Sequence, residues 1–107
     1  MDETQGALTE GVYYTLLALY RPLHGYGIMQ TVRSLSGGRV TLGAGTLYGA
    51  LFALVEKGWI RPCEGGAGGR RKEYEITQRG RAAVKAEIKR LEELLENGKK
   101  IDGGEIQ

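Results

Sequence analysis

A heptad pattern near the end of the chain places the strongest constraint on its fold. Thr77 is a favourable N-cap residue, and helical spacing then continues from residue 78 to Asn97, with Gly98 expected just past the helix end. A helix of this length spans about 30 Å. Its apolar residues step by four, three and four, a heptad seam that extends too far for the rest of the chain to cover. A second copy is therefore expected to cover the predicted interface residues Val84, Ile88, Leu91, Leu94 and Leu95.

Three shorter helices are predicted before the heptad segment, and each ends at a residue that disfavours helical geometry. The first ends before Pro22, because proline disfavours the helical conformation in the residue that precedes it. Glycines that can adopt positive φ close the second helix and the third. The predicted helices cover residues 8–20, 26–35 and 43–57, and the closing glycines are Gly37, Gly38 and Gly58.

Short β-prone segments separate these helices. Residues 59–63 and 72–76 predict a hairpin whose loop, residues 65–69, consists of glycine and alanine. Residues 39–42 predict a further short strand before the third helix. The order helix, helix, helix, hairpin, helix predicts a mainly α protein with a small β-hairpin, an α+β fold of the winged helix-turn-helix type. The expected parts are a winged helix-turn-helix domain (1–77), a C-terminal dimerisation helix (78–98) and a flexible tail (99–107).

Composition predicts a cytoplasmic protein. The chain has 107 residues, which is enough for one domain with a modest core. Its single cysteine, Cys63, excludes an internal disulfide and fits a reducing compartment. No segment is apolar for long enough to span a bilayer, and the chain starts with Asp2 and Glu3 instead of the basic segment of a secretory signal.

Positive charge is concentrated in the middle of the chain. Residues 39–81 carry eight basic and four acidic side chains, a net charge of +4, whereas residues 1–38 and 82–107 each have a net charge of −1. A solvated surface normally mixes the two signs, so this asymmetry favours a polyanionic partner such as double-stranded DNA.

Five sequence blocks follow one another over roughly residues 8–90: His24-Gly25-Tyr26-Gly27-Ile28, Gly45-Thr46-Leu47-Tyr48-Gly49-Ala50-Leu51, Leu54 to Gly58, Tyr74-Glu75-Ile76-Thr77 and Arg79-Gly80-Arg81. In their order and spacing, these blocks resemble the PadR family of transcriptional regulators. The resemblance implies a homodimeric repressor-type protein whose third helix enters the major groove of DNA. Gly43 and Ala44 depart from the Ser or Pro common in the family, a change that weakens a helix cap by only a few tenths of a kcal/mol. The C-terminal region is short for the family, which argues against a dedicated effector domain.

The first turns of the third helix carry the residues predicted to read DNA. Glycines allow close backbone approach, N-terminal helix amides attract phosphate, and two hydroxyl groups can hydrogen-bond to bases. The helix contains no Arg, Asn or Gln, the usual bidentate base readers, so limited sequence readout is expected. Tyr48 could instead belong to the core, with the glycines as packing contacts. The predicted DNA-binding residues here are Gly45, Thr46, Tyr48 and Gly49.

The hairpin provides the predicted contacts to the phosphate backbone. Arg70, Arg71 and Lys72 follow the glycine-rich loop, an arrangement that suits phosphate contact or insertion into the minor groove. Arg39, just before the third helix, is a further candidate for DNA binding. The alternative for these residues is a solvated turn whose charges serve only solubility.

No metal site, cofactor or enzymatic function is predicted. His24 is the only histidine and lies far from Cys63 in the sequence, so no ligand set for a metal is evident. His24 is instead expected to cap the second helix. One histidine and one cysteine also provide no acid–base pair or catalytic triad. Four aromatic residues could line a pocket for a small-molecule effector at the dimer interface, although core and dimer packing is the preferred interpretation: Tyr13, Tyr14, Tyr20 and Trp59.

These features together lead to two hypotheses. The first is a dimeric, sequence-specific DNA-binding transcription regulator that represses a pseudo-palindromic operator. The alternative is a winged helix that docks a protein partner through its third helix and does not bind DNA. Binding to duplex DNA weakens steeply with ionic strength, whereas an apolar docking surface responds little, so salt dependence distinguishes the two.

Overall fold

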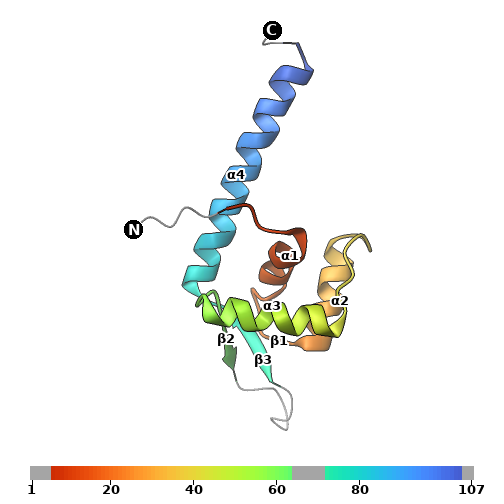
Figure 1. Cartoon of the computed structure of the whole chain (residues 1–107), viewed down its shortest axis with the longest axis vertical. Helices are drawn as coiled ribbons and strands as arrows, with labels where there is room; N and C mark the ends of the chain where they lie inside the picture. The colour runs from red at the N-terminus through yellow and green to blue at the C-terminus, as the bar shows by residue number, and fades with distance from the viewer. Residues whose placement is uncertain (1–5, 64–71, 105–107) are drawn as a thin grey trace.

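The computed structural model describes residues 6–63 and 72–104. It consists of four helices and a small antiparallel sheet, which confirms the predicted fold class (Figure 1). The elements in chain order are α1 (Glu10–Ala18), β1 (Leu23–His24), α2 (Gly25–Leu35), α3 (Ala44–Glu56), β2 (Ile60–Cys63), β3 (Glu73–Ile76) and α4 (Gln78–Asp102).

One hydrophobic core joins the helices to the sheet. Helix α1 contacts both α2 and the start of α4, and α3 packs against α2 and β2. Each large aliphatic side chain removed from water in this core contributes about 1.5–3 kcal/mol. The fully or nearly fully buried aliphatic residues are Leu16, Leu19, Ile28, Val32, Leu47, Leu51, Leu54, Ile60, Ile76 and Val84.

The sheet has the strand order β1-β3-β2, with both pairs antiparallel. The predicted hairpin is confirmed, with Ile60 opposite Ile76. The strand predicted at residues 39–42 is wrong, because this segment has no regular structure and the third strand is β1. The amide of Val40 donates to the Ser36 hydroxyl at 2.9 Å, so the polypeptide leaves α2 in a compact turn instead of joining the sheet.

Helix α4 begins as predicted but extends further. The Thr77 hydroxyl accepts a hydrogen bond from the Gly80 amide at 3.1 Å, as expected of an N-cap. Gly98, predicted to follow the end of the helix, lies inside it, and residues 99–102 are helical instead of part of a tail. The glycine with positive φ after this helix is Gly104, at +81°. Lysines in the last turn favour the longer helix, because they interact with its C-terminal dipole.

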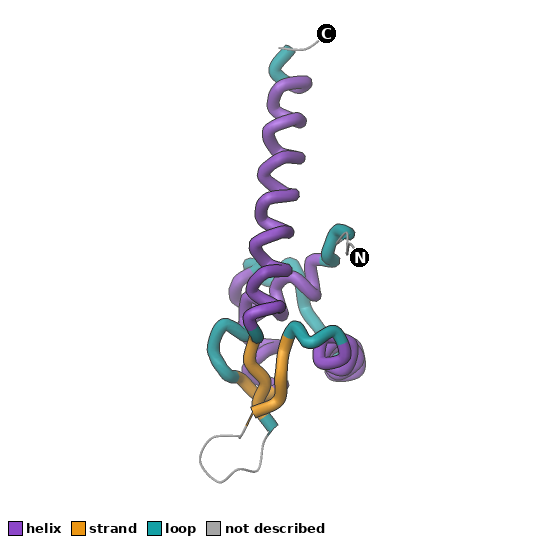
Figure 2. The backbone as a smooth tube through the Cα atoms, turned by 90° about the vertical axis from the view of Figure 1, so that its left-hand side faces the viewer, coloured by secondary structure: helices purple, strands orange, loops and turns teal. Residues whose placement is uncertain are grey.

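The two ends of the molecule have different shapes. The described part measures 61 × 37 × 21 Å, and α4 accounts for most of the long axis. Figure 2 shows α4 rising alone from the helical body, while the β2–β3 hairpin points the opposite way. None of the helices in the described part combines the length and the apolar character that crossing a bilayer requires.

Candidate nucleic-acid interface

The predicted DNA-reading residues lie together on the outer face of α3. Leu47, Leu51 and Leu54 turn one side of this helix into the core. The opposite side therefore faces solvent, and no acidic residue occurs in the first turn. The N-cap is Gly43, which provides no side-chain hydrogen bond to the first amides of the helix. Solvent-exposed on this face are Gly45, Thr46, Tyr48 and Gly49.

Tyr48 links α3 to the start of α2 without entering the core. Its side chain is 52% exposed, and its hydroxyl lies so close to Gly25 that a Cβ there would overlap it. The same tyrosine borders a hollow of about 300 Å³ whose lining includes His24, Lys72 and Tyr74. Tyr48 and Lys72, which were separate predictions from the sequence, thus line one surface hollow.

Arg39 has a partner within the chain. Its guanidinium donates to both carboxylate oxygens of Glu10, at 2.9 and 3.0 Å. These hydrogen bonds raise the pKa of Arg39 and connect the segment before α3 to the first turn of α1. Both side chains are exposed, so the pair contributes little to stability. The long sequence separation explains why the pairing was not predicted.

The described part of the hairpin contains one cross-strand ion pair and one of the predicted basic residues. Arg61 of β2 pairs with Glu75 on the neighbouring strand. Lys72 is exposed immediately before β3. Arg70, Arg71 and the glycine-rich loop at 65–69 lie outside the described residues.

Phe52 is a large apolar residue on the outer face of α3 that the sequence analysis did not single out. It is 70% exposed. Residues spaced by four and then three positions share one side of a helix, so Phe52 follows Gly45 and Gly49 along the same stripe. The exposure of Phe52 was predictable from the sequence, because helical spacing places it away from the side of α3 that carries the buried leucines.

The exposed heptad stripe of α4 begins one step later than predicted. Val84 is only 1% exposed because it packs into the core of its own chain, so the expectation that a second copy buries it is wrong. The four following apolar residues are between 39% and 59% exposed, and Ile101, missed because the helix was predicted to end earlier, extends the apolar surface. The exposed predicted residues are Ile88, Leu91, Leu94 and Leu95.

A buried carboxylate connects α4 to the N-terminal segment. The Glu87 side chain is 3% exposed, and Arg90 donates to its two oxygens at 2.9 and 2.6 Å. The backbone amide of Leu8 is hydrogen-bonded to the same carboxylate. The hydrogen bond from Arg90, more than any other interaction, holds the pKa of Glu87 below its usual value. The ionised carboxylate is therefore the form that the fold stabilises.

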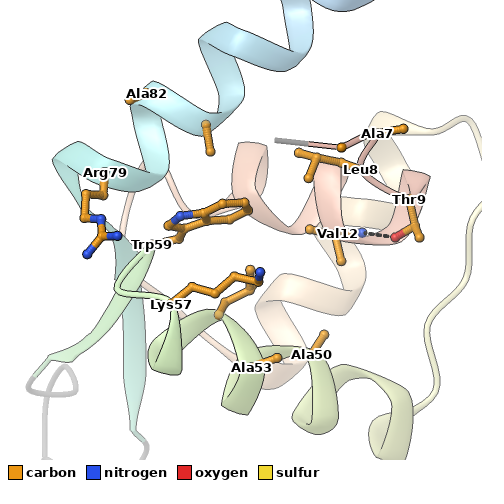
Figure 3. A pocket seen from close by; sticks show the side chains of 13 residues that line it. Ala7, Leu8, Thr9, Val12, Ala50, Ala53, Lys57, Trp59, Arg79 and Ala82 are labelled. Atoms are coloured by element: carbon orange, nitrogen blue, oxygen red, sulfur yellow. Dashed lines mark hydrogen bonds between the residues drawn. The ribbon is translucent and has the colours of Figure 1, made fainter. Parts of the chain in front are cut away.

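A second hollow, of about 660 Å³, lies between the N-terminal segment, α3 and α4 (Figure 3). Trp59 stands in it, with the Lys57 ammonium 5.1 Å from the ring centre and Arg79 nearby. The other aromatic residues considered for an effector pocket lie elsewhere. The rings of Tyr13 and Tyr14 meet edge to face, and the guanidinium carbon of Arg81 lies 4.4 Å from the centre of the Tyr20 ring. The four aromatic residues therefore do not form one pocket in the single chain.

The surroundings of His24 and Cys63 indicate structural roles for both residues. The His24 Nδ1 accepts a hydrogen bond from the Gly27 amide at 3.3 Å, which confirms its predicted role as the cap of α2. Burial, together with Glu75 and Glu73, raises the pKa of the Cys63 thiol and makes its thiolate less accessible. Within residues 6–63 and 72–104, no three potential metal ligands come together.

Comparison with known proteins gives one family match. The model of the transcriptional regulator PadR-like family matches residues 6–86. A protein described as an uncharacterized 37.1 kDa protein in transposon TN4556 of Streptomyces fradiae is 42% identical over 66 residues. That match covers 62% of this chain and 18% of the relative, so the chain spans at most a small part of the longer protein.

Solved structures share the fold over nearly the whole chain. A transcriptional regulator from Clostridium thermocellum is 25% identical, with a TM-score of 0.64, covering 91% of this chain and 92% of the other. A PadR family transcriptional regulator from Eggerthella lenta is 23% identical, with a TM-score of 0.66, covering 84% and 75% of the two chains. The second of these similarities shows the fold alone.

Proposed function

Because the chain belongs to the transcriptional regulator PadR-like family, we propose that it acts in the cytoplasm as a homodimer that binds a pseudo-palindromic operator sequence-specifically and represses transcription. Family membership also confirms the prediction that the chain is a regulator and not an enzyme. The observation that carries the proposal is the outer face of α3. Gly45, Thr46 and Tyr48 are exposed there, and Tyr48 lines one hollow with Lys72 of the hairpin. No carboxylate in the first turn of α3 would repel phosphate.

The assignment of roles follows from the chemistry of each group. Thr46 is proposed to contact a base edge, because its exposed hydroxyl lies in the first turns of α3. The basic residues of the hairpin, Arg70, Arg71 and Lys72, are proposed to contact phosphates, which fixes position without reading sequence. Arg39 is a weaker candidate, since Glu10 already neutralises its charge.

The exposed stripe of α4 supports a homodimer. Ile88, Leu91, Leu94 and Leu95 form an apolar surface on a helix that leaves the body of the molecule, where the described part of the chain does not cover it. A two-fold axis along such a stripe pairs the same surface of two copies. Two copies present two α3 helices, and a dimer of this kind binds two half-sites related by the same symmetry.

One observation supports the alternative of a winged helix that docks a protein partner: Phe52 is exposed, and an aromatic side chain is a common anchor in protein interfaces.

Binding of the purified protein to duplexes selected from a random library, followed by fluorescence anisotropy at several salt concentrations, tests the proposed operator binding. The logarithm of affinity is expected to fall steeply with that of salt concentration. Absence of any enriched duplex would exclude operator binding and favour the docking function.

The hairpin provides a matched test within the same titrations. Each phosphate contact adds about 0.9 to the slope of log affinity against log salt, so changing Arg70 and Arg71 to alanine in both copies is expected to reduce the slope by up to ~4. Operator preference is expected to survive, because α3 is unchanged. An unchanged slope would show that neither arginine contacts a DNA phosphate.

A small-molecule effector remains a prediction. The hollow around Trp59 supports it, because apolar groups from the N-terminal segment, α3 and α4 surround an aromatic ring flanked by Lys57 and Arg79. A ligand there would contact α4 and could alter the orientation of the two copies. Titration of Trp59 fluorescence with small-molecule candidates is the direct measurement, since this is the only tryptophan in the chain.

A further inference from the structure

The outer stripe of α3 has unusual chemistry for a DNA-reading helix. Two of its positions, Gly45 and Gly49, have no side chain, and the third is Phe52, which is 70% exposed. A Cβ at either glycine would meet no atom within 4 Å, so packing within the chain does not require glycine there. The glycines instead leave the phenyl ring as the group that projects furthest along this stripe.

The dimensions of the stripe fit a short run of base pairs. Seven residues of α-helix separate Gly45 from Phe52, a distance of about 10 Å. Base pairs are about 3.4 Å apart, so a helix lying along the major groove would cover about three of them with this stripe. Backbone at Gly45 would approach one end of this footprint and backbone at Gly49 its middle, and the ring of Phe52 would reach the other end.

The ring can make only one kind of base contact in the major groove. It has no donor or acceptor for the base edges, and thymine is the base that presents a methyl group there. Helix α3 contains no arginine, asparagine or glutamine that would read guanine or adenine instead.

We propose that Phe52 is a specificity-determining residue that packs against thymine C5-methyl groups, so that each operator half-site contains thymine at the end of the α3 footprint away from Gly45. The inference rests on the proposed function, because it requires α3 to enter the major groove. The apolar contact between the methyl group and the ring adds to the hydrogen bond proposed for Thr46. It allows this helix to discriminate sequences without the arginine, asparagine or glutamine that usually read bases.

Removal of single methyl groups from the DNA tests the proposal. Duplexes enriched from a random library by the full chain are resynthesised with deoxyuridine in place of each thymidine, which deletes the methyl group and keeps the base pairing. At one or two positions per half-site, the substitution is expected to reduce affinity about fourfold, because the complex no longer buries one methyl-sized apolar group. Fluorescence anisotropy at fixed salt measures the loss.

Variants of Phe52 assign the effect to this side chain. In Phe52→Ala the thymidine and deoxyuridine duplexes are expected to bind equally well at those positions, while Phe52→Leu keeps part of the difference. Leu35→Ala, which removes another exposed apolar side chain from the end of α2, is the control and is expected to retain the full fourfold effect. Thermal melting followed by circular dichroism checks that each variant is folded, which is expected because both residues are exposed.

The possible failures are distinguishable. A library that yields no enriched duplex would overturn the proposed function and this inference together. Enriched duplexes whose affinity is insensitive to deoxyuridine, or a sensitivity that persists in Phe52→Ala, would overturn the role of Phe52 and leave DNA binding intact.

Discussion

Single side chains in this protein connect segments that are distant in sequence. Thr77 caps α4 through its hydroxyl oxygen and donates the hydroxyl proton to the Gly58 carbonyl at 2.6 Å, so one residue links the ends of α3 and α4. Glu87 does the same between α4 and the N-terminal segment at Leu8. A buried carboxylate of this kind depends on its cation, because an unpaired buried charge is costly.

The first prediction concerns Arg90 and pH. Because the folded pKa of Glu87 is lowered, its ionised form stabilises the fold above the usual value of 4.5, and this contribution is lost as pH falls through the folded pKa. Arg90→Met removes the partner, so the free energy of unfolding is expected to drop at neutral pH. The difference from the wild type should shrink as the pH falls from 4.5 through the lower folded pKa, because Glu87 then becomes protonated in the wild type as well and no longer needs a cationic partner. Urea denaturation at one protein concentration measures it.

Lys89→Met is the matched control, because Lys89 is exposed on the same helix next to Arg90. It removes one positive charge without removing a hydrogen bond to Glu87. Equal losses for the two variants at neutral pH would show that net charge, and not the Glu87 pairing, determines stability.

The second prediction concerns Thr46. If its hydroxyl contacts a base edge, Thr46→Ala is expected to reduce discrimination between operator and random duplex DNA by about 1–3 kcal/mol, with little change in non-specific affinity. Anisotropy titrations against the two duplexes measure the difference. Equal weakening on both DNAs would mean that Thr46 contacts phosphate instead of a base.

At the scale of elements, α4 shows that one residue type can have opposite roles within a helix. Gly80 and Gly98 both lie in this helix. A Cβ at Gly80 would overlap the Trp59 carbonyl oxygen and the Ile76 side chain, so the close approach of α4 to the sheet requires glycine. A Cβ at Gly98 would meet nothing within 4 Å, and there glycine only makes the helix more flexible.

The third prediction follows from this contrast. Gly80→Ala is expected to lower the free energy of unfolding by about 1–3 kcal/mol, because Trp59 and β3 must shift to admit the methyl group. Gly98→Ala is expected to raise it by about 0.5–1 kcal/mol, because alanine loses less backbone entropy in a helix interior. Thermal or urea denaturation of the pair provides the comparison. A destabilised Gly98→Ala would indicate that another copy packs closely against this position.

The whole molecule places its two proposed interfaces at separate ends. The outer face of α3 and the hairpin lie at the body, and the apolar stripe of α4 projects away from it along the 61 Å axis. This separation would allow two copies to join through α4 while both α3 helices stay accessible to DNA.

The fourth prediction tests that arrangement. Leu91→Glu places a charge within the exposed stripe and is expected to convert the dimer to monomers, because apolar contacts of about 1.5–3 kcal/mol per leucine are lost in both copies. Ala86→Glu adds the same charge at an exposed position away from the stripe and is expected to stay dimeric. Sedimentation velocity at micromolar concentration distinguishes the states. A wild-type protein that sediments as a monomer would contradict the dimer.

Much of the fold was determined by the sequence itself, because its signals are local. Caps depend on one side chain and an amide three residues away, as at His24 and Thr77. The positive φ of Gly37 and Gly38 ends α2 through backbone geometry alone. Leucines repeated at helical spacing identify the buried side of α3, whichever elements that side packs against. The order of elements, the hairpin and the family resemblance followed from such patterns.

Other features were decided by the tertiary structure, because they depend on which distant segments meet. A heptad pattern cannot distinguish Val84, buried by its own core, from Leu91, which is exposed beyond it. The two residues of β1 are too few to show the alternation of apolar and polar residues that marks a strand. They form a strand only because β2 pairs with one edge of β3 and leaves the other edge for β1. Glu87 appears in the sequence as an ordinary helix-surface charge. Its burial and its lowered pKa arise only when α4 packs against α1 and the N-terminal segment, which determines the free energy of each ionisation state.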